Sequence, residues 1–204
     1  MIKDELVVGI TGASGIIYGV KFLELLLRTP ARVRLIISPA GEEVLRSEIK
    51  LRTRTKGPLK PEAFLDLTDD QRKRIRLDRF DNLAAPTSSG SFRTAGMVVI
   101  PCSMRTVASI AAGLAGNLIT RTADVCLKER RPLILVPRET PLNLIHLENL
   151  LKCARAGAII VPAMPGFYHK PQSIDDLVEF QVMKVFDLLG LEYPFDCRWG
   201  PKSP

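Results

Sequence analysis

The chain has 204 residues, of which 46% are hydrophobic and 25% are charged, and its formal net charge is +7. This composition is typical of a globular domain with one core, and no apolar run approaches the ~20 residues that a membrane-spanning helix needs. The first residues enter a strand pattern without a signal-peptide cleavage pattern, so we expect a cytoplasmic protein. The cysteines form no Cys-x-x-Cys pair, which argues against a zinc site or a disulfide framework; they are Cys102, Cys126, Cys153 and Cys197.

The first predicted unit, residues 6–19, is the most informative part of the chain and reads LVVGITGASGIIYG. A β-favouring apolar run ends in a glycine-rich turn, and a helical pattern follows at once. Free N–H groups and the positive end of the helix dipole make such a turn a binding site for anions, and Ser14 adds a hydroxyl. The turn alone supports equally a phosphate-bearing ligand and an ordinary strand–helix connection with glycines for packing.

The spacing of this turn favours a mononucleotide over a dinucleotide. The dinucleotide pattern is Gly-x-Gly-x-x-Gly with an acidic residue about 20 positions later. Here the glycines are Gly12, Gly15 and Gly19, and the second strand, residues 33–37, ends in Ser38 rather than in a carboxylate. FMN fits this pattern better than NAD.

The remaining chain continues to alternate strand and helix patterns. We expect further strands at 97–100, 133–136 and 158–161, and helices at about 40–50, 106–113, 118–129, 142–155 and 174–189. The segment of about 51–95 is the least regular and has one candidate strand at 74–77. Apolar strands separated by helices predict an α/β fold, a three-layer α/β/α sandwich with a parallel sheet, in a single domain spanning residues 1–204.

Most of the positive charge lies in residues 50–79, which contain ten basic and five acidic side chains. A basic patch can bind nucleic acid, but this segment has one aromatic residue, Phe64, and no nucleic-acid-binding motif. We therefore expect a solvated connector and no nucleic-acid partner.

Ligands of parallel sheets bind beyond the carboxyl ends of the strands, so the residues there form the candidate site. Arg138 can bind a phosphate through two hydrogen bonds, and Glu139 can move a proton. Each side chain taken singly also has an ordinary structural explanation, such as a helix cap or an ion pair. No His, Cys, Asp or Glu residues have metal-ligand spacing, so no metal is expected. Hydroxyl groups are supplied at these strand ends by Ser14, Ser38, Ser103 and Thr106.

Several strings resemble one known family, and LKERRPL, VPRE and PGFYH are the most specific of them. The longer matching strings are ITGASGIIYG (10–19), APTSSGSF (85–92), IPCSMRTVASIAAG (100–113), residues 117–143, HLENLL (146–151), PAMPGFYHKP (162–171) and RWG (198–200). From Ile10 to Gly200 the chain resembles the UbiX-type flavin prenyltransferases. The resemblance implies a flavodoxin- or Rossmann-like fold.

The resemblance also implies an activity. Enzymes of this type join the dimethylallyl group of dimethylallyl phosphate to N5 and C6 of reduced FMN, without a metal. The product, prenylated FMN, is passed to a UbiD-type decarboxylase, and the enzyme is usually a dodecamer. The resemblance leaves open which decarboxylase is served and whether the donor is the monophosphate or the diphosphate.

Site residues carry over from the family by matching motif. The resemblance implies that FMN is bound by Gly12, Ala13, Ser14, Ser38, Ser103, Met104, Arg105, Thr106 and Arg138. It implies that the prenyl phosphate is held by Ser89, Arg121, Lys128, Tyr168 and Lys184. Glu139, Ser14 and Tyr168 are the expected catalytic residues, and Trp199 is expected to close the prenyl pocket. Arg105 departs from the family, in which Gly or Lys is common at this position.

Two other functions remain as alternatives. A flavin-dependent decarboxylase of the related cysteine-decarboxylase family needs a histidine early in the chain, whereas the first histidine here is His146. It also needs a Pro-Ala-Ser-Ala-Asn motif, whereas residues 86–91 read PTSSGS. An FMN carrier needs no binding site for a second phosphate, whereas Lys128, Tyr168 and Lys184 are expected to form one. Both alternatives are therefore less favoured than the prenyltransferase.

Overall fold

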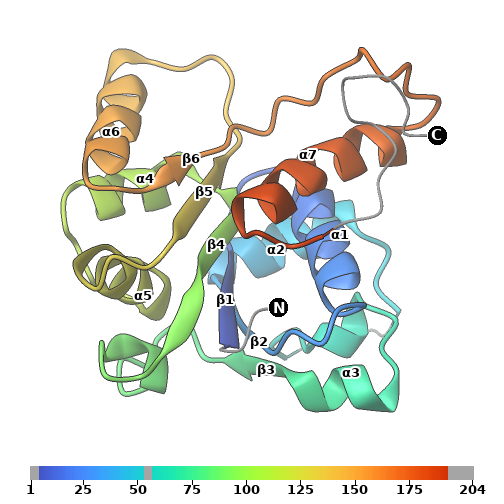
Figure 1. Ribbon diagram of the computed structural model, residues 1–204, viewed down its shortest axis with the longest axis horizontal. Helices are drawn as coiled ribbons and strands as arrows, with labels where there is room; N and C mark the ends of the chain where they lie inside the picture. Colours follow the sequence, from blue (N-terminus) through green and yellow to red (C-terminus); the bar gives the residue numbers. More distant parts are fainter. Residues whose placement is uncertain (1–4, 53–56, 193–204) are drawn as a thin grey trace.

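The computed structural model describes residues 5–52 and 57–192, and its centre is one parallel six-stranded sheet (Figure 1). The strands lie in the order β3-β2-β1-β4-β5-β6. The predicted parallel sheet is confirmed. The strands are β1 (Glu5–Ile10), β2 (Val33–Ile37), β3 (Ile75–Asp78), β4 (Thr94–Cys102), β5 (Leu133–Pro137) and β6 (Ile159–Ile160).

The strand order reverses between β1 and β4, the two central strands. Both strands are apolar on both faces, because Val7 and Val8 of β1 and Val98 and Val99 of β4 are all fully buried. Val8 pairs with Val98 on one side and with Leu35 of β2 on the other. Chain connections leave in opposite directions from such a reversal, so a crevice opens at the carboxyl ends of β1 and β4.

Helices cover both faces of the sheet, which confirms the three-layer prediction (Figure 1). One layer contains α1 (Ile16–Leu26), α2 (Pro39–Glu48) and α7 (Ile174–Leu188), and the other contains α4 (Met104–Ala111), α5 (Leu118–Lys128) and α6 (Leu144–Arg155). The segment 161–173 carries the chain from β6, at the edge of the sheet, to the start of α7 in the layer that contains α1.

Side-chain caps determine where most of these helices begin. The residues that cap five of them are Ser38, Ser103, Asn117, Asn143 and Ser173, each of which accepts a hydrogen bond from a backbone N–H of the first turn. Helices α4 and α6 therefore begin at 104 and 144, two residues from the expected starts at 106 and 142. Helix α1 differs, because its N-cap is Gly15 with φ 95° and no side-chain cap.

The structure adds detail to one prediction about local structure and corrects another. The segment 51–95, expected to be the least regular part of the chain, contains the strand expected at 74–77 as β3, and also the unpredicted helix α3 (Asp69–Arg74) and two single-turn 3-10 helices, Pro61–Ala63 and Pro86–Ser88. The strand expected to be buried at 158–161 is a half-buried two-residue strand, β6, because it lies at the edge of the sheet and has a neighbouring strand on one side only.

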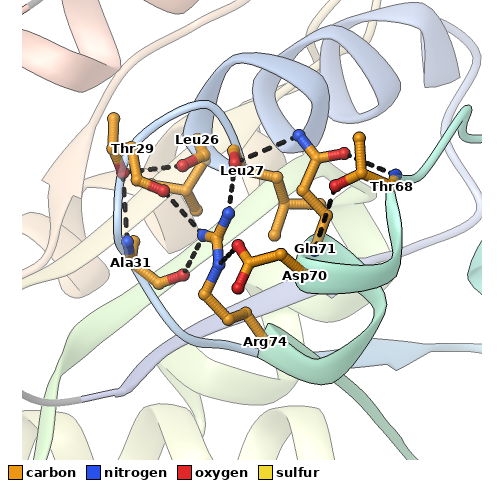
Figure 2. A network of polar contacts seen from close by, with 8 residues as sticks. All are labelled: Leu26, Leu27, Thr29, Ala31, Thr68, Asp70, Gln71 and Arg74. Carbon is orange, nitrogen blue, oxygen red and sulfur yellow. Dashed lines mark hydrogen bonds and ion pairs between the residues drawn. The ribbon is translucent and has the colours of Figure 1, made fainter.

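Many charges of the basic segment are used inside the chain. Arg74 is the clearest case, since its guanidinium donates to the carbonyl oxygens of Leu27, Thr29 and Ala31 at 2.9, 2.6 and 3.0 Å and pairs with Asp70 at 2.8 Å (Figure 2). These carbonyls follow the C-terminal end of α1, where a cation is favoured by the helix dipole. Arg74 therefore attaches α3 to the end of α1.

Among the described residues, no helix combines the length and the apolar character needed to cross a membrane.

Candidate functional site

A cavity of about 680 Å³ lies at the crevice between β1 and β4. Its wall contains Gly12 from the turn after β1 and the first residues of three helices. Ser38 belongs to the start of α2, Ser103 to the start of α4, and Asn117 to the start of α5. The volume is within the usual range for small-molecule sites.

The three helix N-termini make this cavity favourable for an anion. Each contributes free backbone N–H groups and the positive end of a helix dipole. The hydroxyl oxygen of Ser38 accepts from Gly41 N at 3.0 Å, and that of Ser103 accepts from Thr106 N at 3.3 Å. A serine hydroxyl that accepts at a cap still has its hydrogen to donate to a ligand. Arg105, an exposed cation, also lines the cavity.

Thr11 fixes the carboxyl ends of the two central strands to each other. Its buried hydroxyl donates to Pro101 O at 2.9 Å and accepts from Ser103 N at 2.7 Å. The bridge holds the turn after β1 at a set distance from the start of α4. Sequence reasoning treated Thr11 only as part of a turn, and its partners are about 90 residues away in the chain.

A carboxylate already occupies the N-terminus of α1, where the sequence suggested an anion. The N–H groups of Gly15 and Ile16 donate to Glu48 Oε2 at 2.9 and 3.0 Å. A ligand phosphate on these two amides would have to displace Glu48, whereas one at the starts of α2 and α4 would not. No sequence signal identified Glu48, because its role depends on where α2 ends relative to α1.

Arg138 and Ser14 lie together beside the cavity. The Arg138 guanidinium donates from Nε to the carbonyl oxygen of Ser14 at 2.9 Å, which joins the end of β5 to the turn after β1. The ring of Tyr18 is close to Arg138 and to the backbone of Gly15, because a Cβ added to Gly15 would lie 3.1 Å from a Tyr18 ring carbon and 3.8 Å from Arg138 Cγ. Burial raises the pKa of the Tyr18 phenol above its ordinary value, and the nearby Arg138 charge lowers it in part.

The residues predicted to bind FMN are therefore brought to one region. Ala13 and Met104 are buried beneath the surface of this region, and Ser14 and Arg138 form the neighbouring hydrogen-bonded pair. The predicted residues that line the cavity itself are Gly12, Ser38, Ser103, Arg105 and Thr106.

Three of the residues predicted to hold the prenyl phosphate form a first group, on α5 and the loop before β4. Arg121 donates to Ser88 O at 3.0 Å and pairs with Asp124 at 2.8 Å. Lys128 pairs with Glu129 at 2.5 Å. A Cβ added to Gly90 would lie 2.7 Å from Lys128 Nζ, so the loop that carries Ser89 is packed directly against this lysine.

Tyr168 and Lys184 form a second group, on the opposite face of the sheet. Lys184 belongs to α7, and its ammonium lies 5.5 Å from the centre of the Phe180 ring. The Tyr168 ring meets the same Phe180 ring edge-on at 5.4 Å. Because α5 and α7 cover different faces, the two groups lie on opposite sides of the sheet within one chain (Figure 1).

Two further residues were expected at the site. Glu139 is exposed directly after β5, and its carboxylate accepts from Thr140 N at 3.1 Å. Trp199 lies outside the described residues. Within residues 5–52 and 57–192, no group of three or more His, Cys, Asp or Glu side chains could hold a metal ion.

Comparison with known proteins identifies the family. A family model described as Flavoprotein matches residues 1–186. A flavin prenyltransferase UbiX of Alkalihalophilus pseudofirmus is 49% identical over 199 residues, which cover 98% of each chain. The chain belongs to the UbiX flavin prenyltransferase family. The UbiX of Escherichia coli (strain K12) is 43% identical, with 96% of this chain and 97% of the relative covered.

Solved UbiX structures agree with this assignment. A structure of AnUbiX (PadA1) in complex with FMN and dimethylallyl pyrophosphate has a TM-score of 0.80 at 42% identity, covering 93% of both chains. A dodecameric FMN-dependent UbiX-like decarboxylase from Escherichia coli O157:H7 has a TM-score of 0.83 at 42% identity, covering 96% of this chain and 99% of the other. The cysteine decarboxylase TvaF has 13% identity and a TM-score of 0.56, and so shares only the fold with this UbiX-family chain.

Proposed function

We propose that this protein is a flavin prenyltransferase that joins the dimethylallyl group of dimethylallyl phosphate to N5 and C6 of reduced FMN. The observation that carries the proposal is the 680 Å³ cavity at the strand reversal, with three helix N-termini in its wall. The related AnUbiX structure, which contains FMN and dimethylallyl pyrophosphate, supports both ligands.

The residues around the cavity fit FMN. The helix starts at Ser38 and Ser103 suit its phosphate, and Gly12 lines the same cavity, where its missing side chain lets α2 pack close to the turn after β1, because a Cβ on it would lie 2.5 Å from Ala40 Cβ. Arg138 and Ser14 complete the flavin contacts. Reduced FMN, when bound, supplies the nucleophilic nitrogen N5 and the ring carbon C6.

The cationic residues act on the leaving group. Cleavage of an allylic C–O bond places positive charge on the five-carbon unit and leaves the electron pair on the phosphate. Lys128, Arg121 and Lys184, with the Tyr168 phenol, stabilise that developing negative charge, and electrostatic stabilisation of this kind commonly lowers the barrier more than any other effect. The proposed role of the Glu139 carboxylate, which is exposed near the end of β5, is to accept or return a proton.

We propose that the complete binding site for the prenyl phosphate forms at a contact between two copies of the chain. Lys128 and Lys184 lie in helices on opposite faces of one sheet, which supports a site in which a second copy supplies one of the two groups. The dodecameric UbiX-like structure supports a homo-oligomer, and we propose a dodecamer here.

Helix α6 is the surface that best fits such a contact. Cys153 is the one fully buried residue in the helix. Four large apolar side chains on it are at least half exposed, which is unusual for a helix that stays in water. They are Leu144 at 69%, Ile145 at 67%, and Leu147 and Leu151 at 50%.

The downstream partner and the location are part of the same proposal. Prenylated FMN passes to a UbiD-type decarboxylase, as the family resemblance implies. Cys102, Cys126 and Cys153 are free thiols, which supports a reducing compartment such as the cytoplasm.

The direct test is an anaerobic incubation of the protein with reduced FMN and dimethylallyl phosphate, followed by mass analysis of the extracted flavin. We expect a gain of one C5H8 unit, and a parallel incubation with the diphosphate identifies the donor. Tyr168→Phe is expected to bind FMN but lose turnover. Bound but unmodified flavin with both donors would instead support an FMN carrier.

A further inference from the structure

Phe180 of α7 contacts two of the residues proposed to bind the prenyl phosphate, Tyr168 and Lys184. Its buried ring is met edge-on by the Tyr168 ring at 5.4 Å and stacked face to face by the His169 ring at 5.1 Å with an interplanar angle of 4°. The Lys184 ammonium lies 5.5 Å from the same ring centre. Contacts of these kinds stabilise both the partner ring and the partner cation in a defined orientation.

The residues that meet at this ring come from two separate elements. Tyr168 and His169 belong to the segment 161–173, whereas Lys184 is one helical turn after Phe180 on α7. Tyr168 is 42% exposed and Lys184 is also exposed. Exposed side chains of this length have considerable rotational freedom, which must be lost before they can bind a phosphate together.

The backbone of the loop is also pressed against Phe180. A Cβ added to Gly166 would lie 3.1 Å from Phe180 Cζ and 3.3 Å from a Tyr168 ring carbon. The neighbouring Gln181 side chain donates to Pro162 O at 2.8 Å and holds the start of the same loop. The position of Tyr168 therefore depends on the Phe180 ring through both its side chain and its backbone.

We propose that Phe180 is a positioning residue that sets the Tyr168 phenol and the Lys184 ammonium at a fixed separation for the phosphate of the prenyl donor. The inference rests on the proposed function. Phe180 makes no contact with the reacting atoms in this scheme, and it acts by removing conformational freedom from two groups that do.

Phe180→Leu is the first variant, because leucine keeps an apolar side chain but has no ring face. We expect the KM for dimethylallyl phosphate to rise roughly threefold to tenfold, with kcat changed less and FMN affinity unchanged. The dissociation constant of dimethylallyl phosphate for protein loaded with oxidised FMN, measured by calorimetry, should rise by the same factor. This second readout does not depend on turnover.

Gly166→Ala is an independent variant that leaves the Phe180 ring in place. Its added methyl group pushes the loop away from that ring, so we expect a KM increase similar to that of Phe180→Leu. This variant keeps the proposal open to test if Phe180→Leu does not fold.

The matched control is Phe186→Leu on the same helix. Phe186 is fully buried and meets Phe22 edge-on at 5.5 Å, so the substitution removes a similar aromatic contact from α7. It should lower thermal stability but leave the affinity for dimethylallyl phosphate within about twofold of wild type. In a Lys184→Met background, Phe180→Leu should have a smaller effect than in wild type, because one of its two targets is already missing.

The outcomes separate this inference from the proposed function. An active wild-type protein with unchanged KM and dissociation constant in Phe180→Leu and Gly166→Ala overturns the positioning role alone. The positioning role is also overturned if Phe186→Leu weakens donor binding as much as Phe180→Leu does. A wild-type protein that binds dimethylallyl phosphate but does not prenylate FMN overturns the proposed function, and one that does not bind it overturns both.

Discussion

At the scale of single residues, burial makes three cysteines chemically inert. It raises the pKa of the Cys126 thiol to about 12 and that of Cys153 to about 11, and it also raises the pKa of Cys102. Thiolate is the reactive form, so we expect iodoacetamide at pH 8 to leave these three residues unmodified in the folded protein. Peptide mass mapping before and after denaturation checks this, and labelling of any of the three before unfolding would contradict it.

The Glu48 carboxylate caps the N-terminus of α1. It accepts from two N–H groups at the start of α1, which has no other side-chain cap. Glu48→Ala should cost about 1 kcal/mol and lower the thermal midpoint by roughly 2–4 °C, whereas Glu48→Gln should retain part of the effect. Glu43→Ala, an exposed position on the same helix, is the control. Equal thermal midpoints for Glu48→Ala and Glu43→Ala would mean that Glu48 does not stabilise the start of α1.

At the scale of elements, Arg74 joins α3 to the end of α1. Arg74→Met removes a cation from three carbonyl oxygens, and hydrogen bonds to a charged group contribute about 1.5–3 kcal/mol. We expect a clear fall in the midpoint of thermal unfolding. Arg72→Met is the matched control, because Arg72 belongs to the same helix but, among the described residues, forms an ion pair only with the exposed Asp69. A similar fall for both variants would mean that helix propensity, rather than the attachment, is responsible.

The sequence predicted the positions of the helices and strands better than it predicted how they are buried in the fold. Apolar runs and caps located the central strands and most helices to within three residues. Helix α3 was missed although Thr68 and Gln71 form a capping box, a signal that was present in the sequence. The burial of β6 was misjudged because its edge position depends on the strand order, which periodicity does not reveal.

Part of the candidate site was also predictable from the sequence. Ser38 and Ser103 lie at strand ends, where parallel sheets bind ligands, and the structure brings both to the cavity. Two features could not be read from the chain. Glu48 reaches α1 only in the folded state, and the division of Lys128 and Lys184 between opposite faces follows from the strand order.

At the scale of the whole molecule, the exposed apolar side of α6 supports the proposed assembly. Ile145→Glu should leave the fold of one chain intact, because the side chain is 67% exposed, but should reduce the particle mass in light scattering. Leu83→Glu, at an exposed leucine outside α6, is the control and should leave the mass unchanged. An unchanged mass for Ile145→Glu would exclude α6 from the interface.

The placement of Lys128 and Lys184 on opposite faces also has a genetic consequence. If each phosphate site takes one lysine from each of two chains, then Lys128→Ala and Lys184→Ala are each inactive alone but can complement one another. Dissociating and reassociating an equal mixture of the two variants should restore a fraction of wild-type turnover, since some sites receive both intact residues. Two lysines that served one site from the same chain could not be rescued by mixing. Heterozygous cells that carry both alleles would then be expected to retain the activity that neither allele provides by itself.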